Sequence, residues 1–194
     1  MNIISGTARN LALAELPDDG IRPTAVRARK ALFDSLGDFS GRGVLDLCSG
    51  SGALALGAAS RGAKWAAMVE KDPAHLDCIR ENCRRITATG IGTELLIMEF
   101  DIFCFQRYLP QLPGKPEIIF ADPPYNISAD FFQKLLSDDS FIRQLDGAKL
   151  IWEIPDTPGA MGRFINCENL KDLQFRRFGG TIFLTAALWG KGIN

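Results

Sequence analysis

The sequence predicts an α/β fold built on a mostly parallel seven-stranded sheet with helices on both faces. From residue 43 onward, short apolar segments typical of strands alternate with segments typical of helices. This alternation favours parallel strands whose connecting helices cover both faces. The chain has 194 residues, of which 46% are hydrophobic and 23% charged, which is enough for one sizeable core. We therefore predict one domain over residues 41–194, preceded by a small extension over residues 1–40.

The N-terminal extension is expected to contain a hairpin and a helix. Apolar runs at residues 3–4 and 11–13 lie on either side of Gly6, which is the pattern of two short strands and a turn. Thr24 is the expected N-cap of a helix that runs to about Leu36 with one apolar stripe. Glycines follow and end this helix.

The domain that follows alternates strands and helices and closes with a pair of strands. Strands are expected at residues 44–47, 65–70, 95–98, 117–121 and 150–153, with the closing pair at 173–178 and 181–184. Helical segments are expected at residues 53–60, 73–86, 102–108, 131–136 and 141–145. Because ligands bind beyond the carboxyl ends of the strands in such sheets, the residues at those ends indicate the function.

Composition excludes several classes of protein. No apolar run approaches the ~18 residues that span a bilayer, and the first residues lack the pattern of a signal peptide, so we expect a cytoplasmic protein without a membrane partner. The five cysteines form no C-x-x-C pair and there is a single histidine. We therefore expect reduced thiols and no metal site. A monomer is the default expectation.

Charge gives a mixed indication about nucleic acid. The net charge of −1 and the sequence pI of about 5.9 argue mildly against it, because phosphates bind basic surfaces. Positive charge is nevertheless clustered, since Arg22, Arg27, Arg29 and Lys30 fall within nine residues. A solvated helix face is the simpler explanation for any one such group.

Three strand ends carry residues suited to a nucleotide-like cofactor. The first strand continues into a loop whose glycines, Gly50 and Gly52, permit a tight turn and close approach of a ligand to the backbone. Glu70 ends the second strand and can accept both hydroxyl hydrogens of a ribose. Asp101 follows the third, placed either to touch an adenine amine or to cap the helix beginning at Ile102. Each feature alone can be structural, and the glycine spacing also fits the dinucleotide fingerprint.

The fourth strand ends in Asp122-Pro123-Pro124-Tyr125. The two prolines stop the strand and fix the backbone. The Asp122 carboxylate and the Pro123 carbonyl can together accept both hydrogens of a planar amine, and Tyr125 offers a face on which a base can stack. A rigid surface turn is the alternative, but it leaves the neighbouring strand ends unexplained.

These residues resemble the class I methyltransferases, a Rossmann-like fold. The glycine loop looks like their cofactor loop, and the proline tetrapeptide looks like the Asp/Asn-Pro-Pro-aromatic signature of exocyclic amino methyltransferases. The resemblance implies S-adenosyl-L-methionine as cofactor and catalytic roles for Asp122, Pro123, Pro124 and Tyr125. It also implies cofactor contacts from Asp46, Cys48, Ser49, Gly50, Ser51, Gly52, Glu70, Lys71, Asp101 and Ile102.

A narrower resemblance is to the bacterial 16S rRNA (guanine(966)-N2)-methyltransferase family. It is carried by Ile3-Ile4-Ser5-Gly6, by Ile21-Arg22-Pro23-Thr24 with Arg27, by the glycine loop and by residues 122–125. The resemblance implies 16S rRNA as partner, within the small ribosomal subunit or an assembly intermediate, and substrate contacts from Arg22, Thr24, Arg27 and Tyr125. Family members often carry several basic residues after the first glycine, whereas this chain has only Arg9 in that stretch.

Three rival functions stay open at this stage. An adenine-N6 methyltransferase acting on DNA or RNA uses the same tetrapeptide, because guanine N2 and adenine N6 are both exocyclic amines. An NAD-dependent oxidoreductase fits the glycine loop and Glu70 but not residues 122–125. A non-catalytic RNA-binding module has no need for a cofactor loop together with an amine-holding loop.

Overall fold

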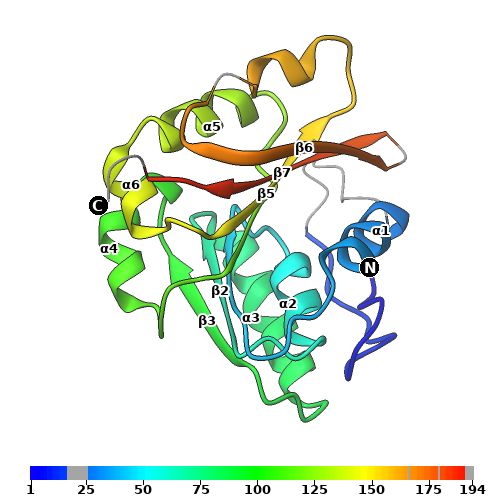
Figure 1. The fold of residues 1–194 in the computed structure, drawn as a ribbon. Helices are drawn as coiled ribbons and strands as arrows, with labels where there is room; N and C mark the ends of the chain where they lie inside the picture. The colour runs from blue at the N-terminus through cyan, green and yellow to red at the C-terminus, as the bar shows by residue number, and fades with distance from the viewer. Residues whose placement is uncertain (17–25, 166, 179, 191–194) are drawn as a thin grey trace.

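The computed structural model describes residues 1–16, 26–165, 167–178 and 180–190. Within these residues, seven strands form one sheet in the order β3-β2-β1-β4-β5-β7-β6 (Figure 1). The parallel strands are β1 (Gly43–Leu47), β2 (Trp65–Glu70), β3 (Glu94–Glu99), β4 (Ile118–Ala121) and β5 (Lys149–Pro155). β7 (Thr181–Leu188) runs antiparallel between β5 and β6 (Leu170–Phe178). The predicted mostly parallel, seven-stranded sheet is confirmed.

Helices cover both faces of this sheet, also as predicted. α1 (Val26–Leu36), α2 (Ala53–Ala59) and α3 (Pro73–Thr87) bury their apolar side chains in a cluster on one face. α4 (Phe105–Tyr108), α5 (Ser128–Leu136) and α6 (Asp139–Gln144) do so on the other face. Short 3₁₀ helices occupy Ile102–Cys104, Leu109–Gln111 and Ala160–Arg163. Since β1, β2 and β4 are covered on both sides, every residue in them is buried.

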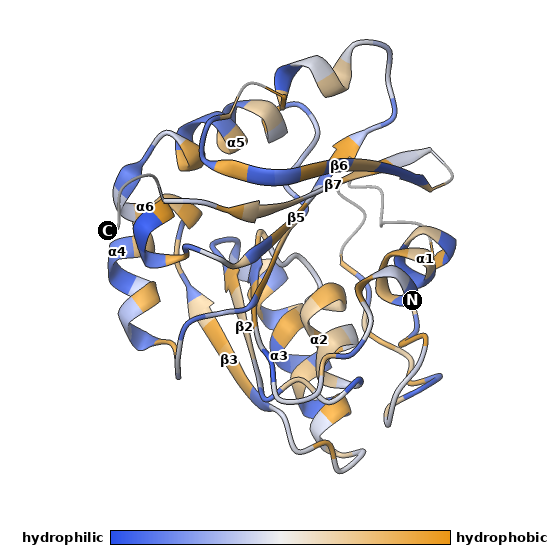
Figure 2. Cartoon of the chain, viewed as in Figure 1, coloured by the Kyte–Doolittle hydropathy of each residue, from blue (hydrophilic) through white to orange (hydrophobic). Residues whose placement is uncertain are grey.

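The outermost strand, β6, has a different character. Its residues alternate between half-buried and exposed because one face is open to solvent. A register shift between Lys171 and Gln174 interrupts its pairing with β7, and Asp172 in this irregular stretch takes a φ of 55°. Figure 2 shows β6 with polar residues interleaved among apolar ones. No helix in the described part of the chain is long and apolar enough to cross a membrane.

The predicted N-terminal hairpin is present. The Ile3 N–H donates to the Leu11 carbonyl at 3.0 Å, and the Asn10 N–H donates to the Ile3 carbonyl at 2.9 Å. Ile3 is buried in the same cluster as α1, so the hairpin packs against the domain. α1 begins within the described residues at Val26, and its expected N-cap, Thr24, lies outside them. The division of the chain at residue 40 stays a prediction.

Candidate active site

The carboxyl ends of the parallel strands bring most of the predicted cofactor and base-binding residues together. Cys48 lies just beyond β1 and is the centre of this group. Burial raises the pKa of the Cys48 thiol well above its usual range, and the nearby carboxylates of Glu70, Asp46, Asp122 and Asp101 raise it further. Acidic side chains at the ends of β1, β2, β3 and β4 therefore all lie close enough to Cys48 to act on its thiol. This arrangement agrees with the expectation that ligands bind beyond the carboxyl ends of the parallel strands.

Asp46 is the most deeply buried of these acids, with 1% of its surface exposed. Its Oδ2 accepts the Ala55 N–H of α2 at 3.1 Å, while its Oδ1 has no hydrogen-bond partner among the described residues. Burial raises the pKa of Asp46 to about 8, and the charge of Glu70 adds to the shift. A buried oxygen without a partner is costly, so Asp46 is available to accept from a ligand.

The loop from Cys48 to Gly52 turns the chain sharply between β1 and α2. Cys48, Gly50 and Gly52 take φ values of 58°, 55° and 78°, a left-handed region that glycine adopts at little cost. Ser49 closes the turn, since its Oγ donates to the Asp46 carbonyl at 2.7 Å and its carbonyl accepts from Gly52 at 2.7 Å. A Cβ on Gly52 would lie 3.1 Å from Met68 Sδ. The loop is therefore held against β2.

Glu70 is buried at the end of β2, with 8% of its surface exposed. Its Oε2 accepts from the Gly50 N–H at 2.9 Å, and its Oε1 accepts from the N–H groups of Lys71 and Asp72 at 2.8 and 3.0 Å. Glu70 thus ties the glycine loop to the start of α3. A carboxylate has about four acceptor positions, so contact with a ribose hydroxyl is compatible with these bonds.

The sequence left two roles open for Asp101, capping of a helix and contact with an adenine, and the structure tests only the first. Its Oδ1 accepts from the Phe103 N–H at 3.0 Å, so the capping interpretation is confirmed. Its Oδ2 pairs with Lys71 Nζ at 2.9 Å. Burial acts to raise the pKa of Asp101, but these two donors outweigh it and hold the pKa below its usual range. Ile102 is buried beside it, and contact with an adenine stays a prediction.

The loop after β4 carries Tyr125, whose hydroxyl bonds the buried carboxylate of Glu153. Pro123 is buried, Asp122 is half-buried and Tyr125 is 42% exposed. The Tyr125 hydroxyl donates to Glu153 Oε1 at 3.0 Å. Burial, followed by the charge of Glu153, raises the pKa of Tyr125 to about 12, so the phenol keeps its proton. The ring is thus anchored at its polar tip and open along its side.

Two buried polar residues near the site were not predicted. Asn82 of α3 is fully buried; its Nδ2 donates to the Ser51 and Ala14 carbonyls at 2.9 and 3.2 Å, and its Oδ1 accepts from the Ala14 N–H at 2.6 Å. It therefore joins the cofactor loop to the N-terminal segment. The second unpredicted buried polar residue is Glu153 of β5. The available signal for Asn82 was its spacing, because Ile79 and Ile86 place it on the buried stripe of α3.

The basic cluster of the N-terminal extension divides into an exposed and a buried part. Arg27 is exposed on α1, as a substrate-facing residue must be. Arg29 is 2% exposed, so the simpler explanation of a solvated face does not apply to it. Arg22 and Thr24 lie outside the described residues. All five cysteines are free thiols.

The site is chemically suited to a cation and poorly suited to a dinucleotide. Its lining carries the carboxylates of Glu70, Asp101 and Asp122 near Cys48, whereas Asp46, with its pKa raised to about 8, adds a polar group rather than a charge. Opposite charges attract strongly where water is scarce, so a ligand with a sulfonium and an ammonium group fits. A pyrophosphate, the linking group of NAD, would meet like charge. This weighs against the oxidoreductase alternative.

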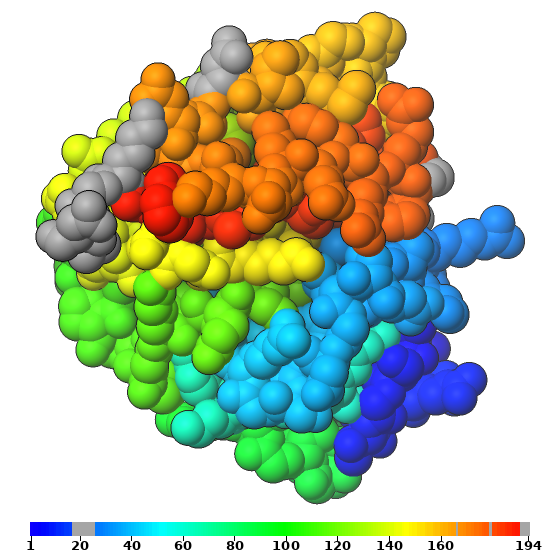
Figure 3. All heavy atoms as spheres, in the orientation of Figure 1, coloured from blue at the N-terminus to red at the C-terminus, as the bar shows by residue number. Residues whose placement is uncertain are grey.

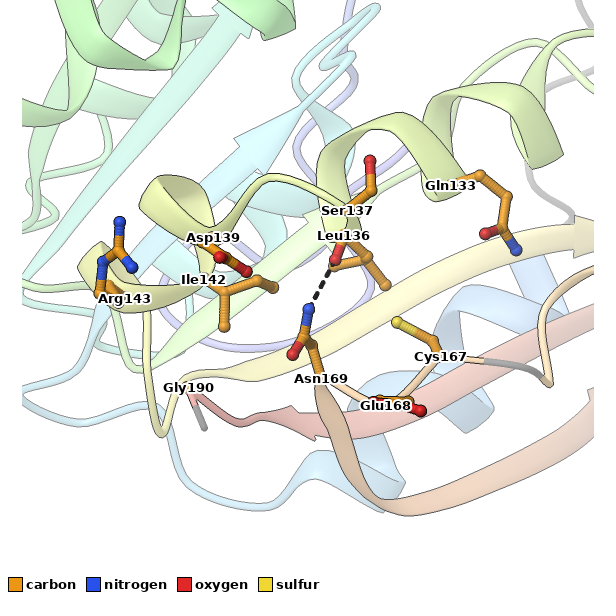
Figure 4. Close-up of a pocket in the computed structure, with 10 residues that line it drawn as sticks. All are labelled: Gln133, Leu136, Ser137, Asp139, Ile142, Arg143, Cys167, Glu168, Asn169 and Gly190. Atoms are coloured by element: carbon orange, nitrogen blue, oxygen red, sulfur yellow. Dashed lines mark hydrogen bonds between the residues drawn. The ribbon is translucent and has the colours of Figure 1, made fainter. Parts of the chain in front are cut away.

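A hollow lies elsewhere and includes none of the predicted residues. It measures about 480 Å³ and is lined by α5, α6 and the residues just before β6 (Figure 4). Asn169 Nδ2 donates to the Leu136 carbonyl at 2.8 Å within it. Gly190, on its rim, follows the end of β7, and that end pairs with the beginning of β5. The hollow therefore lies near the amino end of β5, whereas the candidate active site lies at the carboxyl ends of the parallel strands.

The chain is similar in sequence and fold to known proteins. Residues 1–184 match the family described as conserved hypothetical protein 95. Ribosomal RNA small subunit methyltransferase D of Haemophilus influenzae is 28% identical over 145 residues, 74% of each chain. YlbH of Bacillus subtilis is 31% identical over 173 residues, covering 82% of this chain and 88% of that one. The solved structure of hypothetical protein TTHA0928 of Thermus thermophilus is 30% identical with a TM-score of 0.73, covering 97% and 99%.

Proposed function

This chain belongs to the conserved hypothetical protein 95 family, and on that premise we propose that it methylates the N2 amine of a guanine in 16S rRNA, using S-adenosyl-L-methionine. The fold is the Rossmann-like fold of class I methyltransferases. The name of the Haemophilus influenzae relative, ribosomal RNA small subunit methyltransferase D, supports methyl transfer to rRNA. The N2 position is our own proposal, favoured by the N-terminal resemblance and residues 122–125.

The cofactor is proposed to bind along the carboxyl ends of β1, β2 and β3. When bound, it supplies an activated methyl group on a sulfonium. Asp46 accepts from its methionine end, which matches the unpartnered Oδ1 in the structure. Glu70 holds the ribose, and Asp101 with Ile102 lies by the adenine. Cys48, Ser49, Gly50, Ser51, Gly52 and Lys71 are proposed to complete this surface.

The target base is proposed to bind at the loop after β4. The Asp122 carboxylate and the Pro123 carbonyl accept the two amine hydrogens and so aim the nitrogen lone pair toward the cofactor. Tyr125 stacks on the base, and Pro124 keeps the loop rigid. The chain's contribution is positioning and exclusion of water. Because a paired base hides its amine, the nucleotide must be unpaired or flipped out.

The N-terminal extension is proposed to hold RNA around that base. Arg27 is exposed on α1 and is available to a phosphate. Arg22 and Thr24 are proposed as further contacts from the resemblance alone. Because the stretch that follows Gly6 carries a single basic residue, Arg9, we propose that the substrate is a ribosomal particle rather than naked RNA. We also propose that the protein acts as a monomer in the cytoplasm.

One observation carries the proposal, namely the four carboxylates that converge on Cys48. They join the cofactor loop to Asp122 of the base-holding loop in a single site. The test is transfer of labelled methyl from S-adenosyl-L-methionine to bacterial small-subunit particles and to the naked RNA, followed by digestion to nucleosides. N2-methylguanosine is the expected product. N6-methyladenosine would support the adenine-N6 methyltransferase, and no label in any RNA or DNA would overturn the proposed substrate.

A binding measurement tests the oxidoreductase and the non-catalytic RNA-binding module without any RNA. S-adenosyl-L-homocysteine should raise the melting temperature of the protein, because a ligand that binds only the folded state stabilises it. NAD at the same concentration should leave the melting temperature unchanged. Stabilisation by NAD alone would favour an oxidoreductase, and stabilisation by neither would favour the RNA-binding module.

A further inference from the structure

Glu153 is a buried acid that the proposed chemistry does not use directly. It lies on β5 with 2% of its surface exposed. Its Oε1 accepts from the Tyr125 hydroxyl at 3.0 Å and from Thr181 Oγ1 at 3.4 Å. Both donors come from segments at the carboxyl end of β5, since Thr181 pairs with Pro155. Glu153 therefore joins the base-holding loop to the start of β7.

A buried arginine approaches this acid from the N-terminal extension. Arg29 shares the buried stripe of α1 with Leu32, Phe33 and Leu36, which recur at helical spacing. The ring of Phe33 lies 5.8 Å from that of Phe120 and packs in the same cluster as Ile151. Glu153 follows Ile151 by two residues on the same face of β5. Arg29 lies one turn before Phe33 on α1, so it faces the same side of the sheet as Glu153.

The charges of Arg29 and Glu153 compensate one another. Burial lowers the pKa of Arg29, and the charge of Glu153 opposes that shift. Arg29 Nε and Nη2 have no hydrogen-bond partner among the described residues, so this part of the guanidinium is stabilised by electrostatic attraction alone. Figure 3 shows α1 lying beside the end of β6 on the surface, and the two elements are in contact. The pair is thus enclosed between α1 and the last strands.

We propose that Glu153 and Arg29 are positioning residues that fix the ring of Tyr125 over the target base. Glu153 acts through the Tyr125 hydroxyl, and Arg29 acts by attracting Glu153 and holding it in place. The helix of the N-terminal extension is thereby linked to the base-holding loop. The inference rests on the proposed function for its purpose, but the restraint on Tyr125 is a property of the protein itself and is measurable without substrate.

The first test observes the ring directly. The chain has two tyrosines, Tyr108 and Tyr125, so protein labelled with 3-fluorotyrosine gives two ¹⁹F resonances, which Tyr125→Phe assigns. Glu153→Gln and Arg29→Met should each shift or broaden the Tyr125 resonance and leave that of Tyr108 in place. An unchanged Tyr125 resonance in both variants would overturn the proposal.

A matched control separates this effect from loss of a carboxylate in general. Glu117 Oε2 accepts from the Gly43 N–H at 2.6 Å at the opposite edge of the sheet. Glu117→Gln should therefore leave both resonances where they are. If Glu117→Gln moves the Tyr125 resonance as much as Glu153→Gln does, the shift is not specific to the Glu153–Tyr125 hydrogen bond, and the proposal is overturned. The spectra need no RNA, so they stand even if the proposed function is wrong.

The second test uses methyl transfer. Glu153→Gln and Tyr125→Phe should each lower kcat/KM for the RNA about tenfold and leave the Kd of S-adenosyl-L-homocysteine within about twofold. Because both act through one hydrogen bond, the double variant should be no worse than the more affected single variant. Multiplied losses in the double variant would overturn the proposal. An inactive wild-type protein would instead count against the proposed function.

Discussion

The loops after β1 and β4 follow neighbouring parallel strands, yet they are built from residues with opposite backbone properties. The first has glycines at φ values of 55° and 78°, and its backbone groups bond within the loop and to Val69, Glu70 and Asn82. The second has two prolines, which lack an N–H and fix φ. Asp46 beside the first loop is fully buried, whereas Asp122 of the second is half-buried.

This difference corresponds to two kinds of ligand surface. A glycine loop lets a ligand approach the backbone closely, which suits a cofactor that binds the same way in every turnover. In the proline loop the Pro124 carbonyl accepts from the Ile127 N–H at 3.1 Å, and the two prolines hold the backbone still, which suits orientation of an amine. Substitutions in one loop should therefore change cofactor binding, and substitutions in the other should change turnover.

The largest effect is expected for Asp122→Ala. It removes the acceptor that orients the amine, so kcat should fall about a hundred- to a thousandfold, as for loss of one preorganised polar contact to the reacting group. The Kd of S-adenosyl-L-homocysteine, measured by calorimetry, should change less than about twofold. Asp130→Ala is the control, since Asp130 is exposed on α5 and pairs with Arg163. Loss of cofactor binding together with turnover would contradict the separation of the two loops.

Gly52→Ala should act in the opposite way, on cofactor binding and stability. At a φ of 78°, the new Cβ would lie 3.1 Å from Met68 Sδ, and the strain should cost about 1–2 kcal/mol in the free energy of unfolding. We expect the cofactor Kd to rise about tenfold because the loop must shift. Gly147, with a φ of 81° and open space around it, is the control. Gly147→Ala should lose similar stability and bind cofactor normally.

Asp46→Asn should remove a pH dependence of stability. Folded Asp46 holds its proton up to about pH 8, whereas an unfolded aspartate releases it near pH ~4. The folded state therefore binds more protons between these values, and wild-type stability falls as pH rises through this window. Relative to wild type, the variant should gain about 1–3 kcal/mol between pH ~5 and ~8 in urea melts. A difference that stays constant with pH would mean that Asp46 is ionised throughout.

The smallest effect is expected for Pro124→Ala. Pro124 is exposed, so its replacement removes rigidity and no buried contact. Greater freedom of the unfolded chain should lower stability by about 0.4–1 kcal/mol, and kcat should fall no more than about threefold. A loss as large as that of Asp122→Ala would show that loop rigidity, rather than the carboxylate, governs turnover.

The architecture was predictable because the strands that build the site are short, apolar and bounded by polar residues. The strand at Trp65–Glu70 was predicted with its observed bounds. Others lengthened on pairing, since β5 extends from the expected residues 150–153 to Lys149–Pro155 alongside β7. α5 begins at Ser128 rather than at residue 131, because the polar residues of its first turn interrupt the apolar pattern.

The site was predictable only where its residues follow strands. Glu70, Asp101 and Asp122 were identified in that way, and Asp46 was implied by the family resemblance. The structure brings all four near Cys48, and their contacts with ligands stay predictions. Glu153, Arg29 and Asn82 were missed because their partners are distant in the chain. The Asn82 side chain bonds Ala14, 68 residues away, and Glu153 bonds Tyr125, 28 residues away. Pairings at such separations leave no local pattern.

The interrupted outer strand has a consequence for behaviour at high concentration. An unpaired edge of regular β structure invites a strand from another molecule to add to it and so begin aggregation. On β6 the register shift and the left-handed Asp172 break the row of backbone groups. The charged Lys171, Arg176 and Arg177 add repulsion between identical copies. A strand from a second molecule would find only short matching stretches there, so this edge resists polymer growth.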